Sequence, residues 1–379
     1  MMIRKAVLLL LMIPLLVSFA VLLGTPVSLN AESEKTSPQM CEKRMNVSVG
    51  SQQFAIPYCR SRALSDGHST ALRAVIVIQS SSLNTGDCYQ WMWETVGRAN
   101  KQNITVVYAP QFPVYKDIAA HNLQNNVPVW EDSEWAVGGD SLKLSGARAT
   151  QISSFEVIDK LIKAFYDRQK FPRLQHVVVV GQSAGGQFVN RYAITNGIHE
   201  EAARKGLRMR YVVMNPSHYL YLDNKRPSPV DTILRVPNAM TIFALNNYLP
   251  AAEHHDANSA NCKNYNHYPK GLESLWSYPA RRTLSTIKNN YKTRDARYLA
   301  GALDKERNSA GLSKKCSSDL QGFVRLTRAN LYWKHLKDIY TNDISRYQRI
   351  VIVPGIGHGS ENMFKHPKGG MEHVLDYVP

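Results

Sequence analysis

Short apolar runs alternate with amphipathic stretches along most of the chain. Runs rich in β-branched residues predict six strands, at 74–78, 104–108, 176–180, 211–214, 297–299 and 349–353. Each run is short and apolar, which is typical of strands that helices cover on both faces. The alternation predicts an α/β fold with a mostly parallel central sheet and helices on both faces.

The clearest helix begins at Ser153, with Glu156 three residues later in the arrangement of a capping box. Apolar side chains then recur on one face of this helix, at Phe155, Ile158, Leu161, Ile162 and Phe165. Such a stripe predicts packing against the core. The polar segment 246–270 has no clear period, and so long an irregular stretch predicts a lid or a substrate-facing loop.

The amino-terminal residues have the layout of a secretory signal. Arg4 and Lys5 precede an apolar run over residues 6–23, and the chain then turns polar. The run also approaches the length of a membrane-spanning helix, so a retained N-terminal anchor is the alternative to a cleaved signal. We expect residues 1–31 to direct export to the periplasm or the medium, and residues 32–379 to form a single α/β domain.

The cysteines form an odd set without a C-x-x-C spacing: Cys41, Cys59, Cys88, Cys262 and Cys316. This pattern argues against a zinc site or a thioredoxin-type redox pair. Export would permit disulfide bonds. We expect Cys41 to pair with Cys59 and Cys262 with Cys316, which leaves Cys88 free, although spacing alone does not fix the connectivity.

The chain is strongly basic, with a formal net charge of +16 at pH 7. This excess favours association with an anionic envelope or polymer. The Lys and Arg residues are scattered, and no helix-turn-helix, zinc-finger or aromatic RNA-binding signature accompanies them, so no nucleic-acid partner is expected. Neither the H-E-x-x-H pattern nor a phosphate-binding loop occurs, so no metal or organic cofactor is implied.

The strongest chemical signal lies at residues 181–186, where a four-valine strand meets a helix. Gly181 and Gly185 each lie two residues from Ser183, which permits the sharp turn that lifts a serine hydroxyl above a sheet edge. The helix that follows directs backbone N–H groups toward that hydroxyl. Ser183 is therefore the predicted nucleophile, and a purely structural glycine turn is the alternative.

A serine nucleophile requires a base to take its proton and a carboxylate to orient that base. In folds with this turn the chain order is nucleophile, acid, histidine. His358 is the predicted base, because the last strand runs directly into its glycine-rich loop. Asp304 follows the preceding strand and is the predicted acid, with Asp231, Asp256 and Glu306 as rivals.

The oxyanion that forms on attack requires two backbone N–H donors. Ala184, directly after the nucleophile, is predicted to provide one. The other is expected from the loop after the strand at 74–78, where Ser80 is the first choice and Ser81 the second. A His-Gly pair is common at this place, whereas this chain has Gln79 and Ser80.

Taken together, these motifs resemble a secreted microbial group of serine hydrolases in the α/β-hydrolase superfamily, distantly similar to polyhydroxyalkanoate depolymerases and feruloyl esterases. The resemblance rests on segments 107–112, 130–140, 153–157, 181–193, 215–221, 298–304, 321–322 and 354–358, and on Cys316. It implies the α/β-hydrolase fold, Ser183, Asp304 and His358 as a triad, and Cys262 near Cys316. Gln182 stands where the group often has His.

The residues and the resemblance together predict an exported serine hydrolase that cleaves a small-molecule or polymeric ester through an acyl-serine intermediate. A carboxylic ester hydrolase is the expected class. A peptidase or a thioesterase can use the same triad. The alternative from another class is a catalytically weak protein that binds an envelope or a polymer on the same fold.

Overall fold

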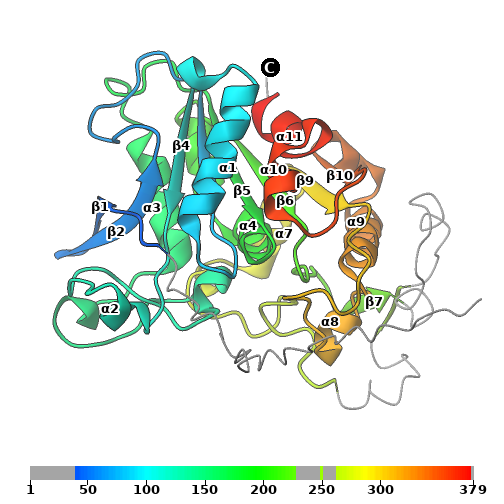
Figure 1. Ribbon diagram of the computed structural model, residues 1–379. Helices are drawn as coiled ribbons and strands as arrows, with labels where there is room; N and C mark the ends of the chain where they lie inside the picture. Colours follow the sequence, from blue (N-terminus) through cyan, green and yellow to red (C-terminus); the bar gives the residue numbers. More distant parts are fainter. Residues whose placement is uncertain (1–38, 228–247, 251–261, 377–379) are drawn as a thin grey trace, which may run out of the picture. The chain divides into compact units, whose positions relative to one another are not determined.

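The computed structural model describes residues 39–227, 248–250 and 262–376 (Figure 1). All of them belong to one compact unit, residues 37–379. The predicted signal at 1–31 lies outside the described residues, as does part of the predicted lid at 246–270. Within the described part of the chain, no helix has the length and apolar character needed to cross a bilayer.

Eight strands form the central sheet. Their order across the sheet is β1 (Lys43–Val49), β2 (Gln52–Arg60), β4 (Thr105–Pro110), β3 (Arg73–Ile78), β5 (His176–Gln182), β6 (Arg208–Met214), β9 (Asp295–Gly301) and β10 (Gln348–Val353). β1 and β2 pair in antiparallel fashion, as do β2 and β4, and the remaining pairs are parallel. The six predicted strands and the mostly parallel sheet are confirmed, whereas β1 and β2 were not predicted.

Helices cover both faces of this sheet. One face packs against α1 (Thr85–Arg98), α10 (Ser360–Lys365) and α11 (Glu372–Leu375). The other packs against α3 (Ser154–Ala164), α4 (Ala184–Thr195), α5 (Ile198–Arg204), α7 (Leu284–Tyr291) and α9 (Arg325–Tyr340). Figure 1 shows α1 beside α10 in front of the strands, and the two helices are in contact.

Smaller elements lie outside these layers. β7 (Lys225–Pro227) and β8 (Tyr248–Pro250) form a separate antiparallel pair. Short α-helices occur at α2 (Asp117–Ala120) and α8 (Cys316–Asp319). Single helical turns occur at Gln102–Ile104, Glu134–Val137, Gly146–Ala149, Pro279–Arg281, Asn342–Arg346 and Pro367–Met371.

The valines of β5 show why the sheet is buried on both sides. Val177 and Val179 contact the α3–α4 face, while Val178 and Val180 contact the α1 face, as the two-residue period of a strand requires. β10 differs because it is an edge strand, and β9 is its one partner among the described strands. Its Arg349 is exposed, so the prediction that every strand is covered on both faces is wrong for β10.

Helix α3 begins as its sequence predicts. The Ser153 side chain accepts a hydrogen bond from the N–H of Phe155 at 3.1 Å, which satisfies one free donor of the first turn. Glu156 does not complete the expected capping box, because its carboxylate accepts from Arg281 at 2.8 Å. The apolar stripe is confirmed as core: Phe155, Ile158, Leu161, Ile162 and Phe165 are all buried.

Both predicted disulfide bonds are present, between Cys41 and Cys59 and between Cys262 and Cys316. Cys88 is free and buried, also as expected. The second bond spans 54 residues, a separation for which the chain-entropy model gives about 4 kcal/mol of stabilisation. It ties the segment at Cys262 to the start of α8.

Part of the basic composition lies inside the protein. Nine arginines are buried among the described residues: Arg73, Arg148, Arg191, Arg210, Arg226, Arg294, Arg297, Arg325 and Arg328. Arg294 illustrates their role, since it donates to the carbonyls of Ala193 and Asn196 at 2.7 Å and pairs with Glu200. A guanidinium group has five N–H donors, which makes arginine suited to bracing several chain segments at once.

One buried carboxylate makes stability depend on pH. Asp159 of α3 accepts hydrogen bonds from the hydroxyls of Tyr192 at 2.7 Å and Tyr278 at 2.6 Å. Burial raises the pKa of Asp159 to about 6, and the two hydroxyl donors offset part of that shift. Because the folded protein holds this proton more tightly than the unfolded chain, stability falls as pH rises from about 4 to about 6.

Replacing Asp159 with Asn removes this titration. We expect the unfolding free energy of Asp159→Asn, relative to the parent, to improve by up to about 3 kcal/mol between pH 4 and pH 7. Urea unfolding of both proteins at the two pH values measures the change, and any constant cost of the amide cancels in the comparison. An equal difference at both pH values would contradict the prediction.

Candidate active site

The turn between β5 and α4 is too tightly packed for side chains at its glycine positions. A Cβ at Gly181 would collide with the backbone of Gly185, and one at Gly186 would collide with the carbonyl of Met214. A Cβ at Gly185 would lie 2.6 Å from the carbonyl oxygens of Ile78 and Gln79. The turn is therefore wedged between the carboxyl ends of β3 and β6, and only glycine permits so close an approach.

Ser183 lies at the centre of this turn with φ 59° and ψ −115°, a conformation that non-glycine residues rarely adopt. Its N–H donates to the carbonyl of Met214 on β6 at 2.9 Å, which holds the turn against the neighbouring strand. The first residue of α4, Ala184, follows directly. The arrangement predicted around Ser183, a strand, a strained serine and a helix, is present.

The three residues predicted to form a triad lie within hydrogen-bonding distance of one another. Ser183 Oγ is 3.1 Å from His358 Nε2, and His358 Nδ1 is 2.8 Å from Asp304 Oδ2. Their loops follow β5, β9 and β10, which all end at the same edge of the sheet. The Asp304 side chain is 2% exposed, whereas that of His358 is 25% exposed. A neutral imidazole that donates from Nδ1 to Asp304 can accept the serine proton at Nε2.

Asn215 joins the loop that carries Asp304 to the loop that carries His358. It follows β6 with φ 41°, a left-handed conformation that Asn tolerates better than most residues. Its Oδ1 accepts from the N–H of Gly301 at 2.8 Å, and its Nδ2 donates to the carbonyl of Gly357 at 3.2 Å. In the sequence, Asn215 was noted only as part of a resembling segment, with no role assigned.

Gln182 fixes the backbone of the predicted base. Its Nε2 donates to the carbonyl of His358 at 3.1 Å. The sequence marked Gln182 only as a departure from the His that the resembling group often has. The contact shows how an amide at this position supports the histidine loop.

Arg325 adjoins the predicted acid on the side away from the histidine. Its Nη1 lies 3.4 Å from Asp304 Oδ1, and both side chains are almost fully buried. Arg325 also donates to Ser309 Oγ and to the carbonyl of Ala310, each at 2.7 Å. Burial lowers the pKa of Arg325 while Asp304 raises it. The guanidinium therefore compensates the buried carboxylate and braces its loop, a role that no local sequence signal indicated.

The rival carboxylates differ in their surroundings. Glu306, two residues beyond Asp304, is exposed. Asp231 and Asp256 lie outside the described residues. Of the acids weighed in the sequence, Asp304 is the one that the described structure brings to His358.

The loop after β3 is the segment predicted to provide the second oxyanion donor. The Ser80 hydroxyl lies 2.8 Å from that of Ser82. Burial raises the pKa of the Cys88 thiol to about 12, and the backbone N–H of Ser80 facing the sulfur lowers it in part. Ser80 stays the predicted second donor for the oxyanion, and Ser81 stays the alternative.

Gln79 connects this loop to the end of β4. Its Oε1 accepts from the N–H of Phe112 at 3.0 Å and from Thr85 Oγ1 at 2.8 Å. Its Nε2 donates to the carbonyl of Phe112 at 3.1 Å. The residue that departs from the common His-Gly pair therefore has a structural function, since its fully buried amide is satisfied at both ends.

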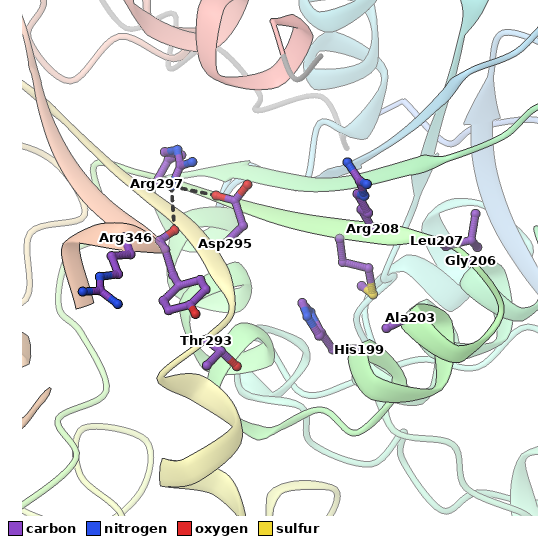
Figure 2. Close-up of a pocket in the computed structure, with 11 residues that line it drawn as sticks. His199, Ala203, Gly206, Leu207, Arg208, Thr293, Asp295, Arg297 and Arg346 are labelled. Atoms are coloured by element: carbon purple, nitrogen blue, oxygen red, sulfur yellow. Dashed lines mark hydrogen bonds and ion pairs between the residues drawn. The ribbon is translucent and has the colours of Figure 1, made fainter. Parts of the chain in front are cut away.

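Two cavities of the described structure lie away from these residues. One of about 520 Å³ opens at the amino ends of β6 and β9, opposite the edge that holds Ser183, and includes His199, Arg208 and Arg346 (Figure 2). There Arg297 pairs with Asp295 at 2.6 Å, as Figure 2 shows. Another of about 510 Å³ adjoins the Cys41–Cys59 bond. In the described part of the chain, no cluster of three or more His, Cys, Asp or Glu residues suits a metal ion.

No protein-family model and no curated protein sequence matches this chain. Several solved structures, however, are similar to it. The poly(3-hydroxybutyrate) depolymerase LpqC from Bordetella parapertussis superposes with a TM-score of 0.54 at 15% identity, over 90% of this chain and 91% of its own. Poly(aspartic acid) hydrolase-1 from Sphingomonas sp. KT-1 superposes with a TM-score of 0.52 at 16% identity, over 89% and 99%. The chain has the α/β-hydrolase fold.

The α/β-hydrolase fold accounts for the order of the three residues along the chain. In this fold a nucleophile follows a central strand, and the acid and the histidine follow later strands at the same sheet edge. Ser183, Asp304 and His358 occur in that order after β5, β9 and β10. The fold class predicted from the sequence is therefore confirmed.

The packing at Gly185 can be tested by adding a single methyl group. We expect Gly185→Ala to lose at least about 3 kcal/mol of stability, because the new Cβ meets two backbone carbonyls that cannot move independently. Gly359→Ala is a matched control in the histidine loop, where the added Cβ would lie 3.6 Å from the nearest atom. Urea unfolding measures both. Equal stability of the two variants would show that the turn has more room than the structure indicates.

Proposed function

We propose that this protein is an exported serine hydrolase that cleaves an ester bond through an acyl-serine intermediate. Ser183 is the nucleophile, His358 the general base and Asp304 the acid that orients it. The observation that carries the proposal is the pair of contacts from Ser183 Oγ to His358 Nε2 and from His358 Nδ1 to Asp304 Oδ2, at 3.1 and 2.8 Å. Ser183 itself has a strained backbone conformation and directly precedes α4.

In the proposed first half-reaction, His358 Nε2 takes the proton of Ser183 as Oγ attacks the ester carbonyl carbon. The carbonyl π electrons move to oxygen and form a tetrahedral oxyanion. When the C–O bond to the alcohol breaks, the imidazolium returns its proton to the leaving oxygen. Asp304 stabilises the imidazolium without becoming protonated itself.

In the second half-reaction, water replaces the alcohol. His358 takes a proton from the water as its oxygen attacks the acyl-serine, and then returns that proton to Ser183 Oγ as the acid leaves. Every step uses groups of this chain and water. Hydrolysis therefore regenerates the starting protonation state of the three residues.

For the oxyanion we propose the N–H of Ala184 as one donor, because it begins α4 and the positive end of a helix dipole favours negative charge. Ser80 was the first choice for the other donor from the sequence. We keep Ser80 as the proposed second donor, with Ser81 as the alternative.

The proposal of an ester substrate draws on the compared structures. By its name, LpqC acts on poly(3-hydroxybutyrate), a polyester, and the other protein acts on poly(aspartic acid). Both are polymers, and the first is joined by ester bonds, which a Ser-His-Asp arrangement can cleave by acyl transfer. A carboxylic ester, small or polymeric, is therefore the substrate class that we propose.

Export is proposed from two features. The first is the cationic and then apolar layout of residues 1–31. The second is the pair of disulfide bonds, which persist in oxidising compartments and are rare in the cytosol. The expected attraction to an anionic envelope rests on exposed Lys and Arg residues alone, since nine arginines are buried.

A fluorophosphonate probe tests the nucleophile. We expect covalent labelling of the folded parent at Ser183 and none in Ser183→Ala, because attack on phosphorus requires the activated hydroxyl. Mass spectrometry of the labelled peptide identifies the site. Ser285→Ala, at an exposed serine of α7, is the matched control and should label like the parent. An unlabelled parent would favour the alternative of a catalytically weak binding protein.

The acid is tested by removing its charge. We expect Asp304→Asn to lower turnover of any ester that the parent cleaves by about 10⁴-fold, the loss found for the best-studied protease triad, because the amide favours the wrong imidazole tautomer. Glu306→Gln is the matched control and should stay within a few-fold of the parent. If Asp304→Asn keeps its activity while Asp231→Asn or Asp256→Asn loses it, the acid has been misplaced.

A further inference from the structure

Four cationic side chains from different parts of the chain surround His218. Arg191 lies on α4, two turns after Ser183, and Arg328 lies in the first turn of α9. Lys270 lies in the loop after Cys262, and Lys315 directly precedes α8. We call these four residues the cationic cluster.

Hydrogen bonds connect the cluster to the nucleophile turn. The N–H of Gln187 donates to the carbonyl of Ser183 at 3.0 Å, and Gln187 Oε1 accepts from Arg191 Nη2 at 3.2 Å. Arg191 Nη2 also lies 2.8 Å from His218 Nε2. His218 lies four residues after Met214. The carbonyl of Met214 accepts the hydrogen bond from the N–H of Ser183. Arg191 is therefore connected to the serine turn along one face of α4.

His218 acts as an acceptor inside this group of cations. Burial lowers the pKa of His218 well below its usual range, and Arg191, Lys270, Arg328 and Lys315 lower it further. A neutral ring that accepts from Arg191 is consistent with that environment. His218 therefore does not add a charge, and it leaves the positive charge of the cluster in place.

The loops that carry the lysines are bound to one another. Lys270 Nζ donates to Ser317 Oγ at 2.6 Å, and Arg191 Nε donates to the neighbouring carbonyl of Pro269 at 3.2 Å. Arg328 Nη2 donates to the carbonyl of Ser313 at 2.9 Å. The Cys262–Cys316 bond fastens the same two loops covalently. The lysines are thus held on braced chain segments.

The positive charge of the cluster is only partly neutralised. Asp319 pairs with Arg328 at 3.0 Å, but it is shared with Arg307, which it meets at 2.6 Å. Among the described residues, no carboxylate pairs with Arg191, Lys270 or Lys315. Burial lowers the pKa of Lys270 to about 8, and the charges of Lys315, Arg191 and Arg328 add to that shift. Lys270 is still protonated at pH 7.

The two kinds of cation differ in what they can still bind. The guanidinium groups of Arg191 and Arg328 are engaged by backbone carbonyls, an amide and the His218 ring. Lys315 is exposed, and Lys270 is partly exposed with a single hydroxyl partner. An ammonium group has three donors, so both lysines can add an anionic ligand without releasing a loop.

We infer that Lys270 and Lys315, with Arg191 and Arg328 behind them, form a subsite for a carboxylate group on the ester substrate. This inference rests on the proposed ester hydrolysis at Ser183 and names the kind of ester that the site prefers. A carboxylate there would pair with two ammonium groups in a partly desolvated place, where such pairing is stronger than in bulk water. The preferred substrates are therefore half-esters of diacids, or ester polymers that carry free carboxylates.

The test compares two esters that differ in one charge, 4-nitrophenyl hemisuccinate and its methyl ester. We expect the parent to show a higher kcat/KM on the anionic ester, with a preference that weakens as salt is added. In the variant Lys270→Met/Lys315→Met, that preference should fall by about tenfold, mainly through KM. Activity on the neutral methyl ester should change little. Lys270→Arg/Lys315→Arg should retain the preference, and Lys292→Met, at an exposed lysine beyond α7, should match the parent.

An unchanged preference in the double Met variant overturns the subsite and leaves the hydrolase proposal intact. If the parent cleaves neither ester and Ser183 stays unlabelled, the proposed function fails, and calorimetry still decides the subsite. In that case succinate should bind the parent at least tenfold more tightly than it binds the double Met variant. Equal binding, or binding of inorganic phosphate without succinate, overturns the carboxylate assignment.

Discussion

The backbone of the turn after β5 touches two neighbouring strands, and the arrangement of the site depends on this contact. Because Gly185 lies against the end of β3 and Gly186 against the end of β6, the turn cannot shift in either direction. Ser183 is consequently held at a positive φ, and its N–H donates a hydrogen bond to the carbonyl of Met214. Strain of this kind persists only where the surroundings over-determine it. Here the sheet itself provides that constraint.

The remaining parts of the site are attached to the same strand ends. Asn215 extends from the end of β6 to both later loops, and Gln182 extends from β5 to the backbone of His358. Both side-chain amides form hydrogen bonds with backbone groups, so they fix the positions of the loops without adding charge. Arg325 adds the only charge in this set, and it is opposite in sign to Asp304. The distance between imidazole and carboxylate is thus set by three side chains besides the pair itself.

Local patterns were sufficient to predict the six central strands and the turn at Ser183, because these depend on residues that are close in sequence. The chain order typical of the fold pointed to Asp304 and His358, which the structure places in contact. The cysteine pairs were expected, although spacing alone did not fix them. Local patterns could not predict Asn215 or Arg325 as parts of the site. These residues act across distances of 86 and 21 positions, respectively, and carry no distinctive motif. Composition was also misleading about charge, since arginines that looked like surface cations brace the interior. Only tertiary contacts distinguish the two.

The four residues of the cationic cluster are expected to have two different electrostatic effects, which the sequence alone did not indicate. Arg191 is fixed by its carbonyl and imidazole contacts, so on the proposed mechanism its charge and the dipole of α4 are present for every ester substrate. Lys270 and Lys315, in contrast, contact a ligand only if it carries an anion of its own. On the proposed mechanism the first effect favours the transition state of every ester, whereas the second favours bound substrate and transition state alike. If the lysines act in this way, they should lower KM for anionic esters and leave kcat unchanged.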